Sequence, residues 1–191
     1  MDYGFFALIF RMKYINRWAL MRCTSEENLS EHSLETAVIA NALANIGNTC
    51  YGKSYNAEKI ALKAIYHDAA EIMTGDLPTP VKYYNTDIRR AYAEVEKCAE
   101  TKILSLLPEE LSDNYSEIFE LSDDERSIIK AADKLCAYIK CKNEVMSGNI
   151  EFSHAEKATK KALDKLKCEE LDYFLKNFLN AFFEPLDNIS L

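Results

Sequence analysis

The chain has 191 residues, of which 48% are hydrophobic and 28% are charged, a composition typical of a globular protein with one substantial core. Its formal net charge of −8 argues against a long nucleic-acid polymer as partner, because proteins that bind such polymers carry clustered positive charge. No uninterrupted apolar run approaches the roughly 20 residues of a membrane span, and the N-terminus lacks the pattern of a signal peptide. We therefore expect a cytoplasmic protein, without a membrane partner, whose six cysteines stay reduced.

Apolar residues recur at three-to-four spacing along most of the chain, and there are only 5 glycines and 4 prolines, so the sequence predicts an all-α fold. In chain order, helices are predicted over residues 3–15, 28–46, 56–73, 86–107 and 122–148, followed by one or two amphipathic helices over 151–183. Asn28 or Ser30 is expected to cap the second helix, and Asn56 the third.

Breaks between these helices are marked by glycine and proline. The segment GDLPTP, residues 75–80, predicts a stiff loop, and Pro108 can occupy the first position of a short helix. Ser122 with Glu125 has the spacing of a capping box, and Gly148 is expected to end the helix that they begin. No stretch has the composition of a linker, so we expect one domain over 1–191, with a core at about 15–148 and C-terminal helices at about 151–183.

Histidine and carboxylate side chains gather in the predicted third helix. In AIYHDAAEIM, Glu71 follows His67 by four residues and Asp68 by three, which places it beside both on a helix surface. Apolar residues flank the group on both sides, so part of it is expected to face the interior or a cleft. A His-Asp pair by itself more often has a structural or surface role than a functional one.

Two further residues extend this group to a metal-ligand set. His32 lies in SEHS near a helix start, and Asp133 lies in KAADKLCAY among apolar neighbours. A buried carboxylate needs a partner, which is either a metal or a nearby lysine such as Lys130 or Lys134. Two imidazoles and two carboxylates suit a borderline divalent cation such as Co, Mn, Fe, Ni or Zn, which can activate water and neutralise phosphoryl charge. Glu71 would then transfer a proton.

Arg17 and Trp18 follow the first predicted helix. The guanidinium of Arg17 offers the paired donors that match a phosphate, although a surface ion pair is the commoner role of a single arginine. Trp18 is either part of a ligand site or an ordinary core residue. His154, in the polar stretch EFSHAEKA, is expected at the surface.

The order His32, His67-Asp68, Asp133 resembles the HD-domain superfamily of metal-dependent phosphohydrolases. The segments INRWALMR (15–22), SEHS (30–33), AIYHDAAEIMTGDLPTPVKYYN (64–85) and KAADKLCAYIKC (130–141) are similar to its bacterial 5′-deoxynucleotidase branch. The resemblance covers nearly the whole chain and weakens after about residue 150. It implies an all-helical HD fold, a homodimer, and a divalent cation such as Co or Mn. It also implies hydrolysis of deoxyribonucleoside 5′-monophosphates to deoxynucleoside and phosphate.

The resemblance also implies roles for individual residues. His32, His67, Asp68 and Asp133 would ligate the metal, Glu71 would be the catalytic acid/base and Arg17 would orient the phosphate. The substrate-binding residues implied are Arg17, Trp18, His32, Asp68, Asp76, Leu77, Pro78, Thr79 and Asp133. No serine or cysteine nucleophile adjoins a histidine base, so direct attack of a metal-activated water is expected. A tight loop at 75–80 would leave no room for a 2′-hydroxyl.

Two other functions fit part of the pattern. An HD hydrolase could act on a deoxynucleoside triphosphate or a signalling nucleotide, although the GYP signature of the cyclic-dinucleotide branch is absent. A metal or nucleotide sensor without catalysis is the second alternative. Glu71 argues against a sensor, because a sensor has no need of a proton-transfer group beside its metal.

Overall fold

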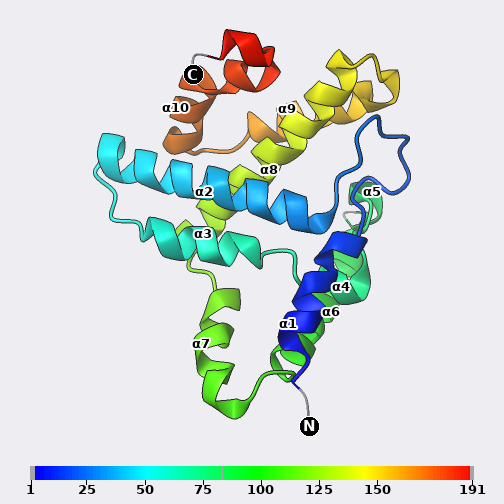
Figure 1. Ribbon diagram of the computed structural model, residues 1–191, viewed down its shortest axis with the longest axis vertical. Coiled ribbons are helices and arrows are strands. Elements are labelled where there is room, and N and C mark those ends of the chain that lie inside the picture. The colour runs from blue at the N-terminus through cyan, green and yellow to red at the C-terminus, as the bar shows by residue number, and fades with distance from the viewer. Residues whose placement is uncertain (1–2, 83, 190–191) are drawn as a thin grey trace. The chain divides into compact units, whose positions relative to one another are not determined.

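A computed structural model describes residues 3–82 and 84–189, and the side chains of residues 79 and 80 are outside that description. The regular elements of this part of the chain are α-helices and short 3-10 helices, without a strand, so the all-α prediction is confirmed (Figure 1). The elements are α1 (Phe5–Ile9), η1 (Phe10–Tyr14), α2 (Leu29–Tyr51), α3 (Ala57–Ile65), α4 (Glu71–Thr74), α5 (Thr79–Lys82), α6 (Thr86–Leu104), α7 (Glu109–Phe119), α8 (Asp123–Met146), η2 (Ile150–Phe152), α9 (Ser153–Leu163), α10 (Glu169–Asn177), η3 (Leu179–Phe183) and η4 (Leu186–Asn188).

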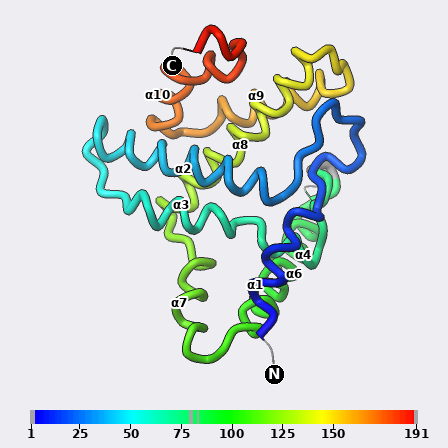
Figure 2. The backbone as a smooth tube through the Cα atoms, in the orientation of Figure 1, coloured from blue at the N-terminus to red at the C-terminus, as the bar shows by residue number. Residues whose placement is uncertain are grey.

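The chain forms two compact units, each built from two separate stretches of sequence. The first contains Met1–Leu34 and Ile65–Leu121, and the second contains Glu35–Ala64 and Ser122–Leu191. Figure 2 shows the backbone of these stretches, coloured from blue at the N-terminus to red at the C-terminus. No helix among residues 3–82 and 84–189 is both long and apolar enough to cross a membrane.

The core of the first unit lies between α1, α6 and α7. Phe5 and Ile103 are fully buried and Leu107 is nearly so. The ring of Phe5 packs edge-on against that of Tyr115, with centroids 5.0 Å apart. The side chain of Asn85 caps α6 by accepting a hydrogen bond from the amide of Ile88. The helix predicted over residues 3–15 is present in this unit as α1, followed by the tighter turns of η1.

The second unit is organised around α8. Ser122 and Glu125 form the predicted capping box at its start, and Gly148, with φ of 85°, follows its end. The carboxylate of Glu125 also lies 2.7 Å from Nζ of Lys63, which is buried in α3. Helix α9 packs along α8 (Figure 1). The amphipathic helices predicted over 151–183 are found as α9 and α10.

The predicted third helix is wrong in its length. Helix α3 ends at Ile65, residues 66–70 form turns, and α4 begins at Glu71. Within this stretch the amide of Glu71 donates to the carbonyl of Asp68 at 2.9 Å, a bond between residues three apart. His67 and Asp68 therefore lie in a turn. Glu71 and Asp68 are neighbours through this turn and not, as predicted, through a shared helix surface.

Other helix boundaries differ by a few residues. Helix α2 continues to Tyr51 and is followed by Gly52 with φ of 66°. Helix α6 ends at Leu104, earlier than predicted, and Pro108 is the N-cap of α7 instead of its first residue. The loop predicted over residues 75–80 is shorter than expected: it ends at Pro78, and α5 begins at Thr79. His154 is exposed, as predicted. Three of the six free thiols are buried, those of Cys136, Cys141 and Cys168.

Candidate metal centre

A short antiparallel bridge brings the segment after η1 against the start of α2. The amide of Arg17 donates to the carbonyl of Glu27, and the amide of Leu29 donates to the carbonyl of Ile15, both at 2.9 Å. The bridge itself pairs Asn16 with Asn28. Arg17 and Glu27 are thereby held side by side in front of the first turn of α2.

That first turn is fixed by a reciprocal cap. The side chain of Asn28 accepts hydrogen bonds from the amides of Ser30 and Glu31, at 3.0 and 3.1 Å. The carboxylate of Glu31 in turn accepts from the amide of Asn28 at 3.1 Å. His32 follows immediately and is fully buried. Asn28, one of the two predicted caps, thus sets the position of a predicted site residue.

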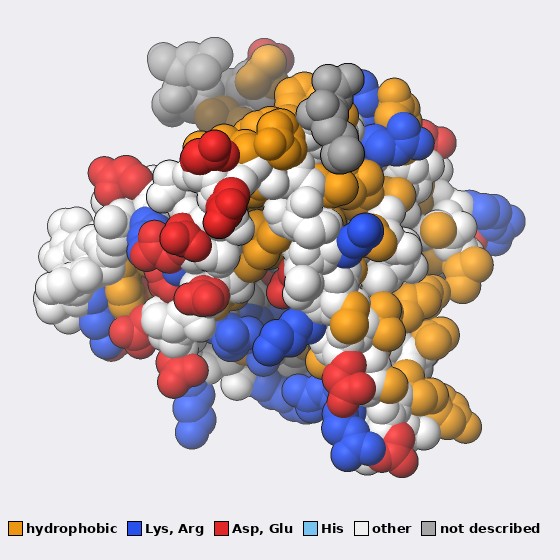
Figure 3. Space-filling view, turned by 90° about the horizontal axis from the view of Figure 1, so that it is seen from below, with side chains coloured by type: hydrophobic (Ala, Val, Ile, Leu, Met, Phe, Trp, Pro, Cys, Tyr) orange, Lys and Arg blue, Asp and Glu red, His pale blue; other side chains and the backbone are white. Residues whose placement is uncertain are grey.

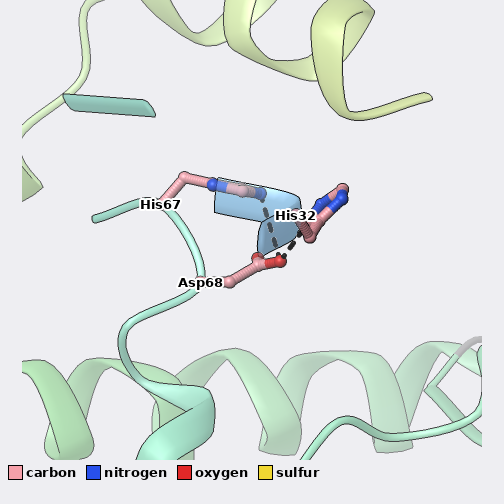
Figure 4. Close-up of side chains that lie close together, drawn as sticks. All are labelled: His32, His67 and Asp68. Carbon is pink, nitrogen blue, oxygen red and sulfur yellow. Dashed lines mark ion pairs between the residues drawn. The ribbon is translucent and has the colours of Figure 1, made fainter. Parts of the chain in front are cut away.

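Three potential metal ligands converge in the first unit. Nε2 of His67 lies 3.1 Å from Oδ2 of Asp68, and Nε2 of His32 lies 3.7 Å from the same oxygen. One ligand atom from each residue lies within 4.8 Å of the other two. Figure 4 shows both imidazoles directed at the Asp68 carboxylate. The rings are tilted by 54° with centroids 5.4 Å apart, so they do not stack face to face.

The donor set fits a divalent cation. It combines two imidazole nitrogens with one carboxylate oxygen, a mixture that suits borderline metals. His32 also has the outer contact that metal-binding histidines usually make, because its Nδ1 lies 3.3 Å from Oε1 of Glu27. This contact leaves Nε2 of His32 to face Asp68. The site is shielded, since the side chain of Asp68 is only 20% exposed.

Glu27 was not predicted from the sequence, yet its buried carboxylate contacts three site residues. It accepts a 2.6 Å hydrogen bond from Nε1 of Trp18, and it lies 3.4 Å from Nε of Arg17 as well as 3.3 Å from His32. Burial alone would raise the pKa of Glu27, but the close contact with His32 and the charge of Arg17 outweigh it and lower the pKa.

Glu71 lies at the N-terminus of α4 with its side chain buried. Burial, reinforced by the negative charges of Asp68 and Asp76, raises the pKa of Glu71 to about 8. Among the described residues, no donor bonds to its buried Oε2 atom. Near neutral pH the side chain therefore retains a proton beside the cluster of donors and can give it up or take it back.

Arg17 connects the donor cluster to Trp18 and Asp76. Its Nη1 lies 3.4 Å from Oδ2 of Asp68, so Arg17 is a largely buried bridge between two carboxylates and not a surface ion pair. Trp18 is half-buried and has φ of 60°, a backbone conformation that costs a non-glycine residue about 1 kcal/mol or more. Its backbone amide hydrogen bonds to Asp76. Burial raises the pKa of Asp76 despite the opposing effect of Arg17.

The remaining predicted residues are not among the three ligands that converge. Leu77 and Pro78 are half-buried in the loop between α4 and α5, and the side chain of Thr79 lies outside the described residues. Asp133 lies in α8, in the second unit, with its Oδ2 atom 3.0 Å from Nζ of Lys134. One of the two lysines considered as its alternative partner is therefore in contact with it, and its place as a fourth ligand stays a prediction.

The chain is similar to known 5′-deoxynucleotidases over nearly its whole length. The family described as "5'-deoxynucleotidase YfbR-like" matches residues 4–182. The 5′-deoxynucleotidase YfbR of Escherichia coli O127:H6 is 48% identical over 189 residues, which cover 97% of this chain and 95% of that protein.

Solved structures show the same fold at lower identity. An HD-domain phosphohydrolase from Listeria innocua has a TM-score of 0.81 and 24% identity, covering 94% of this chain and 88% of its own. The HD phosphohydrolase of cyanophage S-2L, bound to dA and one catalytic Zn²⁺, has a TM-score of 0.64 and 19% identity, covering 94% of this chain and 96% of its own.

Proposed function

The chain belongs to the 5′-deoxynucleotidase YfbR-like family, and from this we infer that it is a phosphoric monoester hydrolase that converts deoxyribonucleoside 5′-monophosphates to deoxynucleoside and phosphate. One observation of the site carries this conclusion. Two histidines and an aspartate converge within 4.8 Å, beside a buried glutamate whose pKa is raised to about 8. A binding protein that only sensed nucleotides would have no use for such a proton-transfer group.

We propose that His32, His67 and Asp68 hold one divalent cation, with Asp133 as the fourth protein ligand. A borderline cation such as Co²⁺ or Mn²⁺ suits this mixed set of nitrogen and oxygen donors. When bound, such a cation lowers the pKa of water and neutralises charge on a phosphoryl oxygen. Burial of His32 and its contact with Glu27 keep the imidazole in one orientation before any cation arrives.

Two residues of this chain would act on the phosphate itself. Arg17 would place its guanidinium against the phosphoryl oxygens, because Asp68 and Glu27 already fix its direction. Glu71 would exchange a proton with the attacking water or the leaving 5′-oxygen, since burial raises the pKa of its carboxyl to about 8 in the metal-free protein and its side chain lies beside the donor cluster. With no covalent nucleophile required, the reaction is a direct attack of water on phosphorus.

The nucleoside would lie against Trp18 and the loop after α4. Asp76, Leu77 and Pro78 belong to this loop, and Thr79 follows as the first residue of α5. The bond between the Trp18 amide and Asp76 keeps the start of the loop beside Trp18. We propose that the stiff loop excludes a 2′-hydroxyl and so selects the deoxyribose. Equal turnover of AMP and dAMP would contradict this part of the proposal.

We also propose that the protein is a cytoplasmic homodimer. Support for self-association comes from aromatic side chains along α1 and η1, where Phe6, Phe10 and Tyr14 are 46%, 73% and 65% exposed. Figure 3 shows exposed hydrophobic side chains on one face of the molecule. Exposed aromatic residues in this number are typical of surfaces that bind another protein. Molar mass in solution, measured by light scattering, tests the dimer.

A phosphate-release assay over a panel of nucleotides tests the proposed activity. Deoxynucleoside monophosphates, the matching ribonucleotides and deoxynucleoside triphosphates are each incubated with the protein and Co²⁺ or Mn²⁺. We expect phosphate from the deoxynucleoside monophosphates and much less from the other two classes. Release from triphosphates alone would assign the protein to another HD hydrolase activity, and no release from any nucleotide would favour a sensor.

A further inference from the structure

The loop between α4 and α5 begins at a contact with α6. The hydroxyl of Tyr92 lies 3.0 Å from Oγ1 of Thr74 and donates to the carbonyl of Gly75 at 3.5 Å. Gly75 has φ of 73° and ψ of 161°, a conformation that is essentially restricted to glycine. The chain therefore changes direction at Gly75, and Tyr92 bonds at that point of change.

The other end of the loop is also tied to α6. Lys82, the last residue of α5, has its Nζ atom 2.8 Å from Oε1 of Glu96. The same nitrogen lies 4.9 Å from the centroid of the Tyr92 ring, within the range of a cation–π contact. Both Lys82 and Glu96 are largely shielded, with side chains 27% and 29% exposed. Lys82 therefore joins the two anchors of the loop to each other.

Tyr92 and Glu96 are four residues apart on α6, so they lie on one face of the same helix. The helix holds them at a fixed spacing. Tyr92 contacts Gly75 at the start of the loop, and Glu96 contacts Lys82 at the end of α5, which follows the loop. The backbone amide of Trp18 holds the intervening residue Asp76. The loop is thus attached at three points: at Gly75 by Tyr92, at Asp76 by Trp18, and through Lys82 by Glu96.

We propose that Tyr92 and Glu96 are positioning residues that set the preference for deoxyribose over ribose. This inference rests on the proposed function, in which the loop after Gly75 lies against the sugar. Neither residue needs to contact the substrate. Removing the Tyr92 hydroxyl would release the carbonyl of Gly75 and let the loop move away from the sugar by small amounts. A looser loop would bind the deoxynucleotide less well and admit the 2′-hydroxyl more easily.

Steady-state kinetics with dAMP and AMP test this proposal in Tyr92→Phe and Glu96→Gln. We expect KM for dAMP to rise at least three-fold in Tyr92→Phe while kcat changes less than two-fold. The ratio of kcat/KM for dAMP to that for AMP should fall at least five-fold. The affinity for Mn²⁺, measured by calorimetry, should not change. A role limited to stability would lower the melting temperature without moving the substrate ratio.

Matched controls are available close to both residues. Tyr84→Phe removes a hydroxyl from a side chain that is 77% exposed, and Glu94→Gln makes the same charge change on the exposed side of α6. Both controls should retain the wild-type substrate ratio. Thr74→Val removes the partner of the Tyr92 hydroxyl from the other side and supplies the answer if Tyr92→Phe does not fold. Combined with Tyr92→Phe, it should add little to the effect of either change alone.

Unchanged KM and unchanged substrate ratio in Tyr92→Phe, Thr74→Val and Glu96→Gln would overturn the proposal. The proposal would also be overturned if the ratio of kcat/KM for dAMP to that for AMP fell in Tyr92→Phe by no more than it does in the Tyr84→Phe control. These results are distinct from failure of the proposed function, which would appear in the wild-type protein as no preference for dAMP over AMP. The wild-type ratio is therefore measured first, and the variants are compared with it.

Discussion

Nδ1 of His32 lies 3.3 Å from Oε1 of Glu27, on the side of the imidazole opposite to the atom that faces Asp68. A carboxylate in this position favours a proton on Nδ1 and leaves Nε2 as a lone-pair donor. Because the same carboxylate contacts Arg17 and Trp18, one buried acid orients the proposed metal ligand, the arginine proposed to bind phosphate and the indole proposed to lie against the nucleoside.

Glu27→Gln tests the importance of this acid. The amide has the same shape but no charge, so it holds the imidazole of His32 and the guanidinium of Arg17 less firmly. We expect the affinity for Mn²⁺ to fall by about 10-fold to 100-fold, as for other outer-shell changes at metal sites. Calorimetric titration of the metal-free protein measures it. Glu26→Gln, the same change at the exposed preceding residue, should have no effect, and equal affinities in both variants would rule out the assigned role.

Asp68→Ala and Glu71→Ala separate metal binding from proton transfer. Asp68 is at the centre of the donor cluster, so its removal should abolish both metal binding and turnover. Glu71→Ala should retain the metal and reduce kcat by about 10²-fold to 10⁴-fold, the usual contribution of a general acid or base. Metal titration and phosphate release on the same preparations give both quantities. A Glu71→Ala protein with the wild-type rate would show that the proton goes elsewhere.

The raised pKa of Glu71 predicts a pH dependence of stability in the metal-free protein. The folded pKa of about 8 lies above the ordinary value of 4.5, so the folded state keeps a proton that the unfolded state releases between these values. This group therefore lowers stability as pH rises from about 4.5 to 8, by up to about 1.4 kcal/mol per pH unit. In Glu71→Gln this loss is absent.

Thermal melts in the presence of a chelator measure the effect. The melting temperature of Glu71→Gln should rise relative to wild type between pH 5 and pH 8, and the gap should stop growing above that range. A constant difference between the two proteins over the whole range would show that the Glu71 carboxyl is not held protonated by its surroundings.

Asp133 has two possible partners, and a pair of variants distinguishes them. If Asp133 is a metal ligand, Asp133→Ala should weaken Mn²⁺ binding strongly while Lys134→Ala leaves it within about two-fold. If the carboxylate serves chiefly to pair with Lys134, whose Nζ atom is 3.0 Å away, both variants should have similar stability and unchanged metal affinity. Calorimetry and thermal melts together decide between these roles.

The sequence predicted those features of the fold that depend on neighbouring residues. Asn28, Asn56 and Ser122 mark helix starts through side chains that accept hydrogen bonds from amides two or three positions later. Glu125 completes the capping box by accepting from the amide of Ser122, three positions earlier, so all of these bonds are readable locally. The end of α3 was not readable in this way. Apolar spacing continues past Ile65, but the backbone changes to bonds between residues three apart around His67 and Asp68.

The residue types of the site could be predicted from the sequence, but the contacts that orient these residues could not. His32, His67 and Asp68 were identified by residue type and order, and the structure brings them together. Glu27 was missed because the bridge between Asn16 and Asn28, which brings it beside Arg17, pairs segments twelve residues apart. No local pattern specifies such a pairing. The contacts of Tyr92 with the loop were hidden for the same reason, since Thr74 and Tyr92 are eighteen residues apart.

Phosphate release from dAMP by metal-stripped protein, before and after a divalent cation is restored, tests the central claim most directly. We predict no release while a chelator is present and full recovery when Co²⁺ or Mn²⁺ is added in excess. His67→Ala should not recover under the same conditions. Undiminished release from the stripped protein, or no release from dAMP with any cation, would contradict the assignment of a metal-dependent deoxynucleotidase.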